Sequence, residues 1–292
     1  MMKKTALVTG GTSKDVPAMA CLVMNIKDTN PNLADEIVIF HDGILQKDQK
    51  LINEIFPTRF ILYELPFKDV SNFGEIVTKY FSPMVFCKYE CFKLLNDYEC
   101  VIWTDYDVVL IDNISSLIAN LNRNCAFMTD KKLSIKEMFN QNILQYDISC
   151  IDIERKGVCT PLFILKDSLP DYIVYYNKCL QLTKDFAECL HLAEQCVLNI
   201  LIQQNNICYD NIPYIPYCTH PIDDVIDNQT KILHAYGSFK FWDGIYNKTW
   251  ENNYKKWIRM GGTPYKHRTL IGKIRRSILY RYVRKIIKLF LC

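Results

Sequence analysis

The sequence is poor in the features that mark flexible, exported or membrane-spanning chains. Its 292 residues include 10 glycines and 11 prolines, so no long flexible linker is expected to divide the chain. It contains no uncharged apolar run of about 18 residues, which a spanning helix requires. The apolar stretch before Gly10 is too short for a signal-peptide core. An apolar content of 49% is enough for a large core, which excludes a disordered or fibrous protein.

Cysteine is abundant, but its spacing lacks the pattern of a metal or redox centre. Thirteen cysteines occur, and no two of them form a C-x-x-C pair. Zinc sites and thiol-exchange centres commonly use that spacing. We therefore expect reduced thiols that serve as small apolar core residues.

Acidic residues are missing from the last part of the chain. The segment up to Glu251 has 23 basic and 32 acidic side chains, whereas the 41 residues after it have 12 basic and no acidic ones. Apolar residues recur in this segment at helical spacing: Ile271, Ile274, Ile278, Tyr282, Ile286 and Phe290. The pattern predicts a basic amphipathic helix that lies on an anionic membrane surface.

These observations predict a body at 1–257 and a membrane-associating tail at 258–292. With no export signal, we expect a cytoplasmic protein attached peripherally to the inner face of the plasma membrane. Nucleic acid is not expected as a partner, because the apolar face of the tail requires an apolar surface. The alternative for the tail is packing on its own body.

The first half of the chain alternates between strand-like and helix-like segments. This order predicts an α/β fold with a mainly parallel sheet, whose ligands gather at the carboxyl ends of the strands. The expected strands are Thr5–Thr9, Glu36–His41, Arg59–Leu65, Glu99–Thr104, Cys125–Thr129, Leu162–Leu165 and Lys231–His234. The expected helices are Val16–Ile26, Lys47–Phe56, Pro83–Leu95, Ser115–Leu121 and Cys189–Gln203.

Two carboxylates follow one of the expected buried strands. Asp105 and Asp107 come directly after Glu99–Thr104, and the alternation of an extended chain places both on one side. They would repel each other unless a hard divalent cation such as Mg²⁺ or Mn²⁺ neutralised them. The alternative is a turn or a helix cap without a metal.

A second group of polar residues follows the last expected strand, in the segment ILHAYGSFKFW. His234 ends this strand, and an imidazole suits a metal such as Mn²⁺. Gly237 permits close approach of a ligand to the backbone, and Lys240 supplies a compact positive charge for a phosphate. A structural role for a single histidine is the alternative.

The segments TDYDVVLIDNISSL, AEQCVLNILI and ILHAYGSFKFWDG together resemble glycosyltransferase family 8, the retaining enzymes with the GT-A fold. The resemblance extends from Thr5 to about Trp257. Within the family, the chain is similar to the lipooligosaccharide galactosyltransferases. Its most specific element is H-x-x-G-x-x-K-x-W, which begins at His234. The family usually has Pro where this chain has Phe241.

The resemblance implies a role for each matching residue. It implies Mn²⁺ (or Mg²⁺) ligands at Asp105, Asp107 and His234, and a diphosphate contact at Lys240. The nucleotide-binding positions that it implies are Thr9, Gly10, Gly11, Tyr106 and Gly237, with Thr9 to Gly11 at the uracil and ribose.

Further positions that the resemblance implies face the sugar. Gln195 and Glu194 match the family's pair at the start of a helix beside the reacting carbon, and Asp130 is a candidate acceptor for sugar hydroxyls, or else a turn residue. Lys88 stands where the family often has an Arg that contacts donor sugar and phosphate. Cys159-Thr160-Pro161 replaces the family's Asn-Ala-Gly.

The resemblance implies a retaining transfer of a hexose from a UDP-sugar to a glycan or glycolipid acceptor, in lipopolysaccharide biosynthesis or a related pathway. Two alternatives stay open. The segment Val8 to Thr12 and the pair Tyr236 and Lys240 are similar to an NAD(P)-dependent short-chain dehydrogenase, which needs further glycines and a helix around that pair. The other alternative is a catalytically inactive, membrane-associated protein that binds sugar nucleotides.

Overall fold

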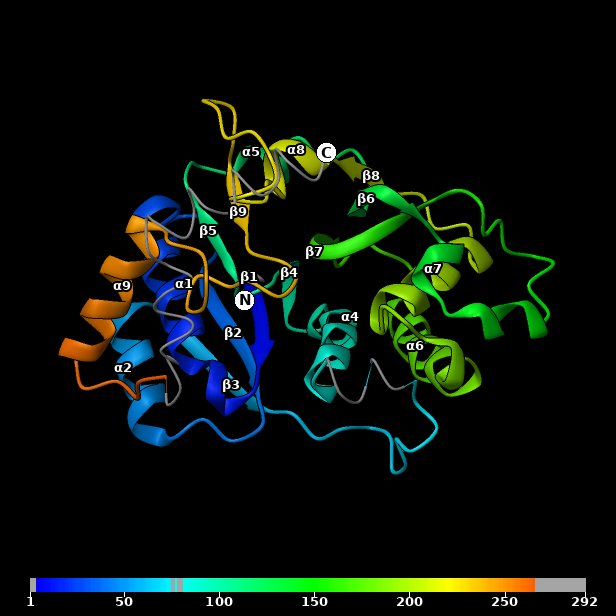
Figure 1. Ribbon diagram of the computed structural model, residues 1–292, viewed down its shortest axis with the longest axis horizontal. Coiled ribbons are helices and arrows are strands. Elements are labelled where there is room, and N and C mark those ends of the chain that lie inside the picture. Colours follow the sequence, from blue (N-terminus) through cyan, green and yellow to red (C-terminus); the bar gives the residue numbers. More distant parts are fainter. Residues whose placement is uncertain (1–3, 75–76, 78–80, 266–292) are drawn as a thin grey trace, which may run out of the picture.

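A computed structural model describes residues 4–74, 77 and 81–265 of the chain. Its main sheet has the strand order β3-β2-β1-β4-β7-β6-β8, in which β7 is antiparallel to both of its neighbours and the other pairs are parallel. A second sheet pairs β5 with β9 (Figure 1). The strands are β1 (Lys4–Gly11), β2 (Glu36–His41), β3 (Thr58–Leu62), β4 (Tyr98–Thr104), β5 (Val108–Leu110), β6 (Cys125–Ser134), β7 (Lys156–Lys166), β8 (Asp210–Ile212) and β9 (Ile232–His234).

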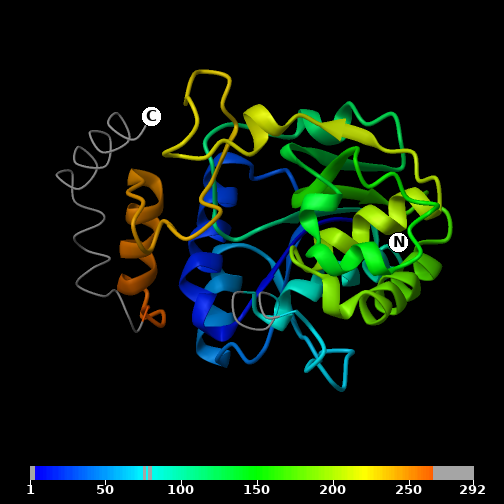
Figure 2. The same ribbon diagram turned by 45° about the vertical axis from the view of Figure 1, so that its right-hand side comes forward.

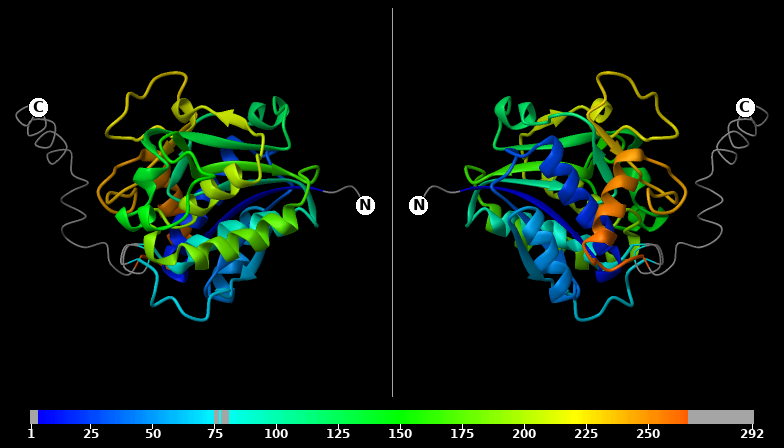
Figure 3. Two further views of the ribbon diagram at one scale, coloured as in Figure 1. Left: turned by 90° about the vertical axis from the view of Figure 1, so that its right-hand side faces the viewer. Right: turned by 90° about the vertical axis from the view of Figure 1, so that its left-hand side faces the viewer.

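The sheet has an apolar face on each side because its strands are apolar at successive positions. Leu7 of β1 belongs to one core cluster, whereas Val8 belongs to the other. Helices cover both faces (Figure 3). The α-helices are α1 (Val16–Thr29), α2 (Gln46–Ile55), α4 (Glu90–Leu94), α5 (Ser116–Ala119), α6 (Tyr172–Asp185), α7 (Glu194–Gln204), α8 (Tyr214–Tyr217) and α9 (Lys248–Arg259).

Helix α1 is enclosed by the sheet, α2 and α9. Every residue from Val16 to Ile26 is buried, so no side of the helix carries a polar stripe. Trp250 and Trp257 of α9 are buried seven positions apart, on the face that packs on α1. Figure 2 shows α9 in orange alongside the blue α1.

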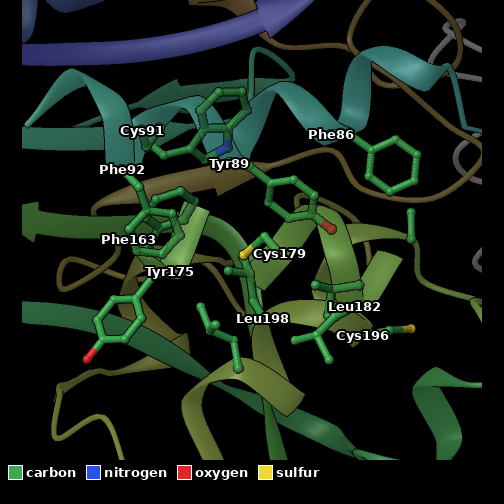
Figure 4. Close-up of a cluster of buried hydrophobic side chains, with 14 of the residues drawn as sticks. Phe86, Tyr89, Cys91, Phe92, Phe163, Tyr175, Cys179, Leu182, Cys196 and Leu198 are labelled. Carbon is green, nitrogen blue, oxygen red and sulfur yellow. The ribbon is translucent and has the colours of Figure 1, made fainter. Parts of the chain in front are cut away.

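The opposite face of the sheet carries the cluster drawn in Figure 4, where aromatic rings from 83–94 meet α6 and α7. Cys91, Cys179 and Cys196 are buried among them as free thiols. Most other described cysteines are also buried and form no disulfide, in agreement with the prediction of small core residues.

Most of the expected elements are present, with differences at their ends. The predicted strand Leu162–Leu165 lies in the second half of a longer strand, β7. The predicted helix at Pro83–Leu95 begins as a 3₁₀ helix over Pro83–Tyr89 and continues as α4. The predicted start of α7 at Cys189 is wrong by five residues: a short 3₁₀ turn at Ala187–Cys189 and the strained Ala193 (φ +44°) precede Glu194.

The end of the described chain still contacts the body. Thr263 donates its backbone N–H to Asp48 at 2.9 Å, and the ring of Tyr265 stacks on Trp242. Residues 258–265 therefore pack on the body, while 266–292, which carry the predicted amphipathic helix, lie outside the described residues. None of the described helices is long and apolar enough to cross a membrane.

Candidate active site

The end of β4 and the end of β9 bring three of the predicted side chains together. Asp105 leaves β4 directly, and its backbone N–H donates to the carbonyl of Pro161 at 3.0 Å. Asp107 is held one residue before β5, which pairs with β9 so that Val108 lies opposite His234. The pairing of two short strands therefore joins residues that are more than 120 positions apart.

The ligand atoms of Asp105, Asp107 and His234 lie within 4.8 Å of one another. The Nε2 atom of His234 is 3.1 Å from an Asp107 oxygen and 3.7 Å from an Asp105 oxygen. Two carboxylates and an imidazole form a donor set that suits Mn²⁺ or Mg²⁺. The predicted ligands are thus assembled in a geometry that fits such a cation.

Charges are balanced tightly around Asp107. Its second oxygen lies 2.5 Å from the Lys240 ammonium. Burial raises the pKa of Asp107, but Lys240 and His234 outweigh burial and hold it below the ordinary value. Burial lowers the pKa of His234, but the Asp107 carboxylate outweighs it and raises that pKa to about 10. In the absence of a cation the protein itself supplies the neutralising positive charges.

Lys88 lies beside this cluster as a buried cation, and 7% of its surface is exposed. Its ammonium is 3.1 Å from Asp105 and 2.7 Å from Glu194, and it donates to the backbone and side-chain oxygens of Thr160 at 3.2 Å. The Thr160 hydroxyl donates to Glu194 at 2.7 Å. Thr160, in the segment that departs from the family pattern, therefore helps to anchor Glu194.

Glu194 and Gln195 point to different places, as expected for adjacent residues of a helix. Glu194 is buried against Lys88 and Thr160. Gln195 is partly buried, and its amide group lies 3.5 Å from the sulfur of Met138. The predicted role of Gln195 beside a sugar stays a prediction.

The last residues of β1 are packed more tightly than their predicted nucleotide contacts suggest. Thr9 is fully buried, and a Cβ on Gly10 would lie 2.5 Å from the Cys87 sulfur. A Cβ on Gly11 would lie 2.8 Å from the ring of Tyr106, so glycine lets that ring lie against β1. Packing is therefore one reason for both glycines.

Gly237 lies in the loop after β9, and Asp130 lies in the irregular second half of β6. Gly237 has φ +78°, which favours glycine, and the space where its Cβ would stand is open. Asp130 accepts the backbone N–H groups of Lys132 and Leu133 at 2.8 and 2.9 Å. This is the turn role considered from the sequence, and the sugar contact of Asp130 stays a prediction.

The sequence analysis did not predict an aromatic stack that lies beside the site. Tyr106 stacks on Trp242 with ring centroids 5.9 Å apart, and Trp242 stacks on Tyr265 at 5.5 Å. Trp242 is the last residue of the H-x-x-G-x-x-K-x-W motif, so its ring supports the loop that carries Lys240. The helical spacing of Trp250 and Tyr254, which extend the stack, could have indicated it.

The dehydrogenase alternative does not fit this geometry. Tyr236 and Lys240 follow β9 in a loop rather than on a helix, and Lys240 is paired with Asp107. The pair therefore lacks the helical setting that the alternative requires.

A family model matches about the first half of the chain. Residues 8–151 match the family model described as glycosyl transferase family 8. No curated protein sequence matches the chain significantly.

Several solved structures with a similar fold are glycosyltransferases. The galactosyltransferase LgtC, in complex with donor and acceptor sugar analogues, has a TM-score of 0.63 and 10% identity over 92% of this chain and 99% of its own. GlyE of Streptococcus pneumoniae TIGR4 has a TM-score of 0.57 and 14% identity, over 91% and 67%. The bifunctional glycosyltransferase WbbM has a TM-score of 0.65 and 11% identity over 89% of this chain, which spans about half of WbbM (52%). The fold is therefore the GT-A fold that the sequence predicted.

Proposed function

The chain is a glycosyltransferase of family 8, and we propose that it transfers a hexose from a UDP-sugar to a glycan acceptor with retention of anomeric configuration. The observation that carries this proposal is the cluster of Asp105, Asp107 and His234 with Lys240 beside it. Carboxylates, imidazole and a nearby ammonium are the groups that a cation and a diphosphate require together.

The proposed cation is Mn²⁺ or Mg²⁺, which when bound would act as a Lewis acid for the departing diphosphate. Lys240 already lies 2.5 Å from Asp107, so its ammonium needs little movement to contact a phosphate near the cluster. This positive charge would stabilise the negative charge that develops on the diphosphate as its bond to the sugar breaks.

Gln195 and Glu194 are proposed to act on the sugar side of the site. A neutral amide is a poor nucleophile, so Gln195 positions the sugar and stabilises positive charge through its carbonyl oxygen. Glu194 is fixed by Lys88 and Thr160, which suits a residue that holds a hydroxyl or shapes the site. Trapping a glycosyl adduct on either side chain would contradict these roles.

The test is release of UDP from a panel of UDP-sugars with MnCl₂, with candidate glycan acceptors and without them. The wild-type chain should release UDP from at least one donor. Asp107→Ala should abolish release, because water replaces neither the charge nor the orientation of the carboxylate. Asp112→Ala, which removes an exposed carboxylate paired with Lys231, is the matched control and should leave the rate unchanged. Metal-dependent UDP binding without turnover for any donor would favour the inactive alternative.

We further propose that the basic segment 266–292 attaches the protein to the anionic inner face of the plasma membrane, where a lipid-linked acceptor would be found. Support comes from the charge pattern of the sequence alone. Each basic residue near such a surface contributes about 1 kcal/mol, so Arg275→Ala, Arg276→Ala and Arg281→Ala together should weaken binding roughly a hundredfold. Sedimentation with phosphatidylserine vesicles measures this, and equal sedimentation of variant and wild type would contradict the proposal.

A further inference from the structure

Cys218 occupies a buried position beside the metal cluster that no motif indicated. It follows α8 directly, and 1% of its surface is exposed. The next residue, Thr219, is tied to β9 on both sides: its N–H donates to Ile232 at 3.1 Å, and its carbonyl accepts the N–H of His234 at 3.0 Å. These backbone bonds hold Cys218 alongside the imidazole of His234.

The imidazole of His234 is held between this thiol and the carboxylates. Its Nδ1 atom lies 3.2 Å from the sulfur of Cys218. On the other side of the ring, Nε2 lies 3.1 Å from Asp107 and 3.7 Å from Asp105. Both ring nitrogens of His234 therefore have a protein neighbour, and Nε2 faces the predicted metal.

The position of Nε2 determines which nitrogen carries the proton. A metal at Nε2 takes the lone pair of that nitrogen, so a neutral imidazole must carry its proton on Nδ1. The group that Nδ1–H then meets is the sulfur of Cys218, which acts as a weak acceptor. In the protonated imidazolium Nδ1 also carries a proton, so the Nδ1–H···S contact is compatible with both states.

We propose that Cys218 is a positioning residue that orients His234 and holds it in the Nδ1–H tautomer needed for metal binding through Nε2. The proposal rests on the proposed function, because it assumes that His234 ligates a cation. Metal-binding histidines usually donate this second proton to a carboxylate, a backbone carbonyl or water. Here the sulfur of Cys218 takes that place.

The role of Cys218 can be tested by measuring the binding of MnCl₂ to the full chain by isothermal titration calorimetry at a fixed UDP concentration. Partners of ligating histidines typically alter metal affinity by about 10- to 100-fold. Cys218→Ala should weaken Mn²⁺ binding by that factor. Cys218→Ser, whose hydroxyl oxygen can still accept the hydrogen bond from Nδ1–H, should fall between it and wild type. Cys179→Ala, which deletes a buried thiol in the cluster of Figure 4, is the matched control and should bind Mn²⁺ as wild type does.

A second readout reports on the tautomer itself. In ¹⁵N-histidine spectra with MgCl₂ and UDP, wild-type His234 should carry its proton on Nδ1, and Cys218→Ala should show a mixture of tautomers. If wild type bound no cation, the proposed function would fail. If wild type bound Mn²⁺ and both Cys218 variants bound it equally well, the role of Cys218 alone would be overturned. If Cys218→Ala did not fold by circular dichroism, Cys218→Ser would decide between these outcomes.

Discussion

The substitution Lys88→Met tests whether the buried ammonium holds the two sides of the active site together. Methionine has a similar length but no charge, so it leaves the carboxylates of Asp105 and Glu194 without their shared cation. Both carboxylates lie within 3.1 Å of the Lys88 ammonium. Removing one partner of a buried ion pair costs about 3–5 kcal/mol, because an uncompensated charge stays buried. We expect a loss of this size at pH 8.

The pH dependence of the loss gives a sharper test. Burial lowers the pKa of Lys88, but Asp105 and Glu194 outweigh it and raise that pKa above its ordinary value. A raised lysine pKa stabilises the fold fully below the unfolded value of about 10.4, and the contribution is lost as pH rises through the folded value. The contribution of Lys88 should therefore be constant between pH 5 and pH 9 in wild type. In the variant, acid should neutralise the stranded carboxylates, so the loss should be smaller at pH 5 than at pH 8.

Urea unfolding of both proteins at pH 5 and pH 8 measures these differences. Lys93→Met is the matched control, because Lys93 pairs with Glu90 at 2.7 Å but its side chain is 47% exposed. Exposed pairs contribute about 0–1 kcal/mol, so this variant should stay near wild type at both pH values. A loss below 1 kcal/mol for Lys88→Met, or the same large loss at both pH values, would refute the reasoning.

Three further predictions follow from the site. Gly11→Ala should destabilise the fold by about 1–3 kcal/mol in urea unfolding, because its Cβ would lie 2.8 Å from the ring of Tyr106; wild-type stability would contradict this packing. Affinity for Mn²⁺ should rise with pH between 6.5 and 8.5, because His234, with a pKa of about 10, must lose its proton to ligate; calorimetry showing no proton release would disprove it. Gln195→Ala should lower kcat in UDP-release assays while Mn²⁺ affinity stays unchanged, and a normal kcat would remove Gln195 from the mechanism.

The cluster of Asp105, Asp107 and His234 was predictable because its residues lie next to elements that the sequence marks clearly. Asp105 and Asp107 follow a continuous apolar strand, and His234 ends another, so local patterns identify all three. Local sequence patterns do not predict that these three side chains come together in space. It rests on the antiparallel pairing of β5 with β9. The sequence did not predict this pairing; the resemblance to a known family implied only that the three residues share one cation.

The remaining features depend on contacts that no short segment encodes. Most residues of helix α9 are charged or polar, and its tryptophans are buried because they pack on the apolar surface of α1. The pairing of Lys88 with Glu194 joins residues that are distant in the sequence. The contact of Cys218 with His234 depends on how the chain returns to β9. Burial and long-range pairing determine these features, and only the helical spacing of the aromatic residues in α9 gave a local sign of any of them.

The enclosure of α1 has a consequence for how the chain is made. Asn253 of α9 donates to the carbonyl of Cys21, 232 positions earlier. At 5–20 residues per second, a ribosome needs roughly 12–46 s to add that length of chain. In the finished protein Trp250 and Trp257 cover an apolar surface of α1. Throughout this interval that surface is not covered by α9. The nascent chain should therefore be a client for chaperones that hold apolar segments, and release from them should coincide with emergence of α9 from the ribosome.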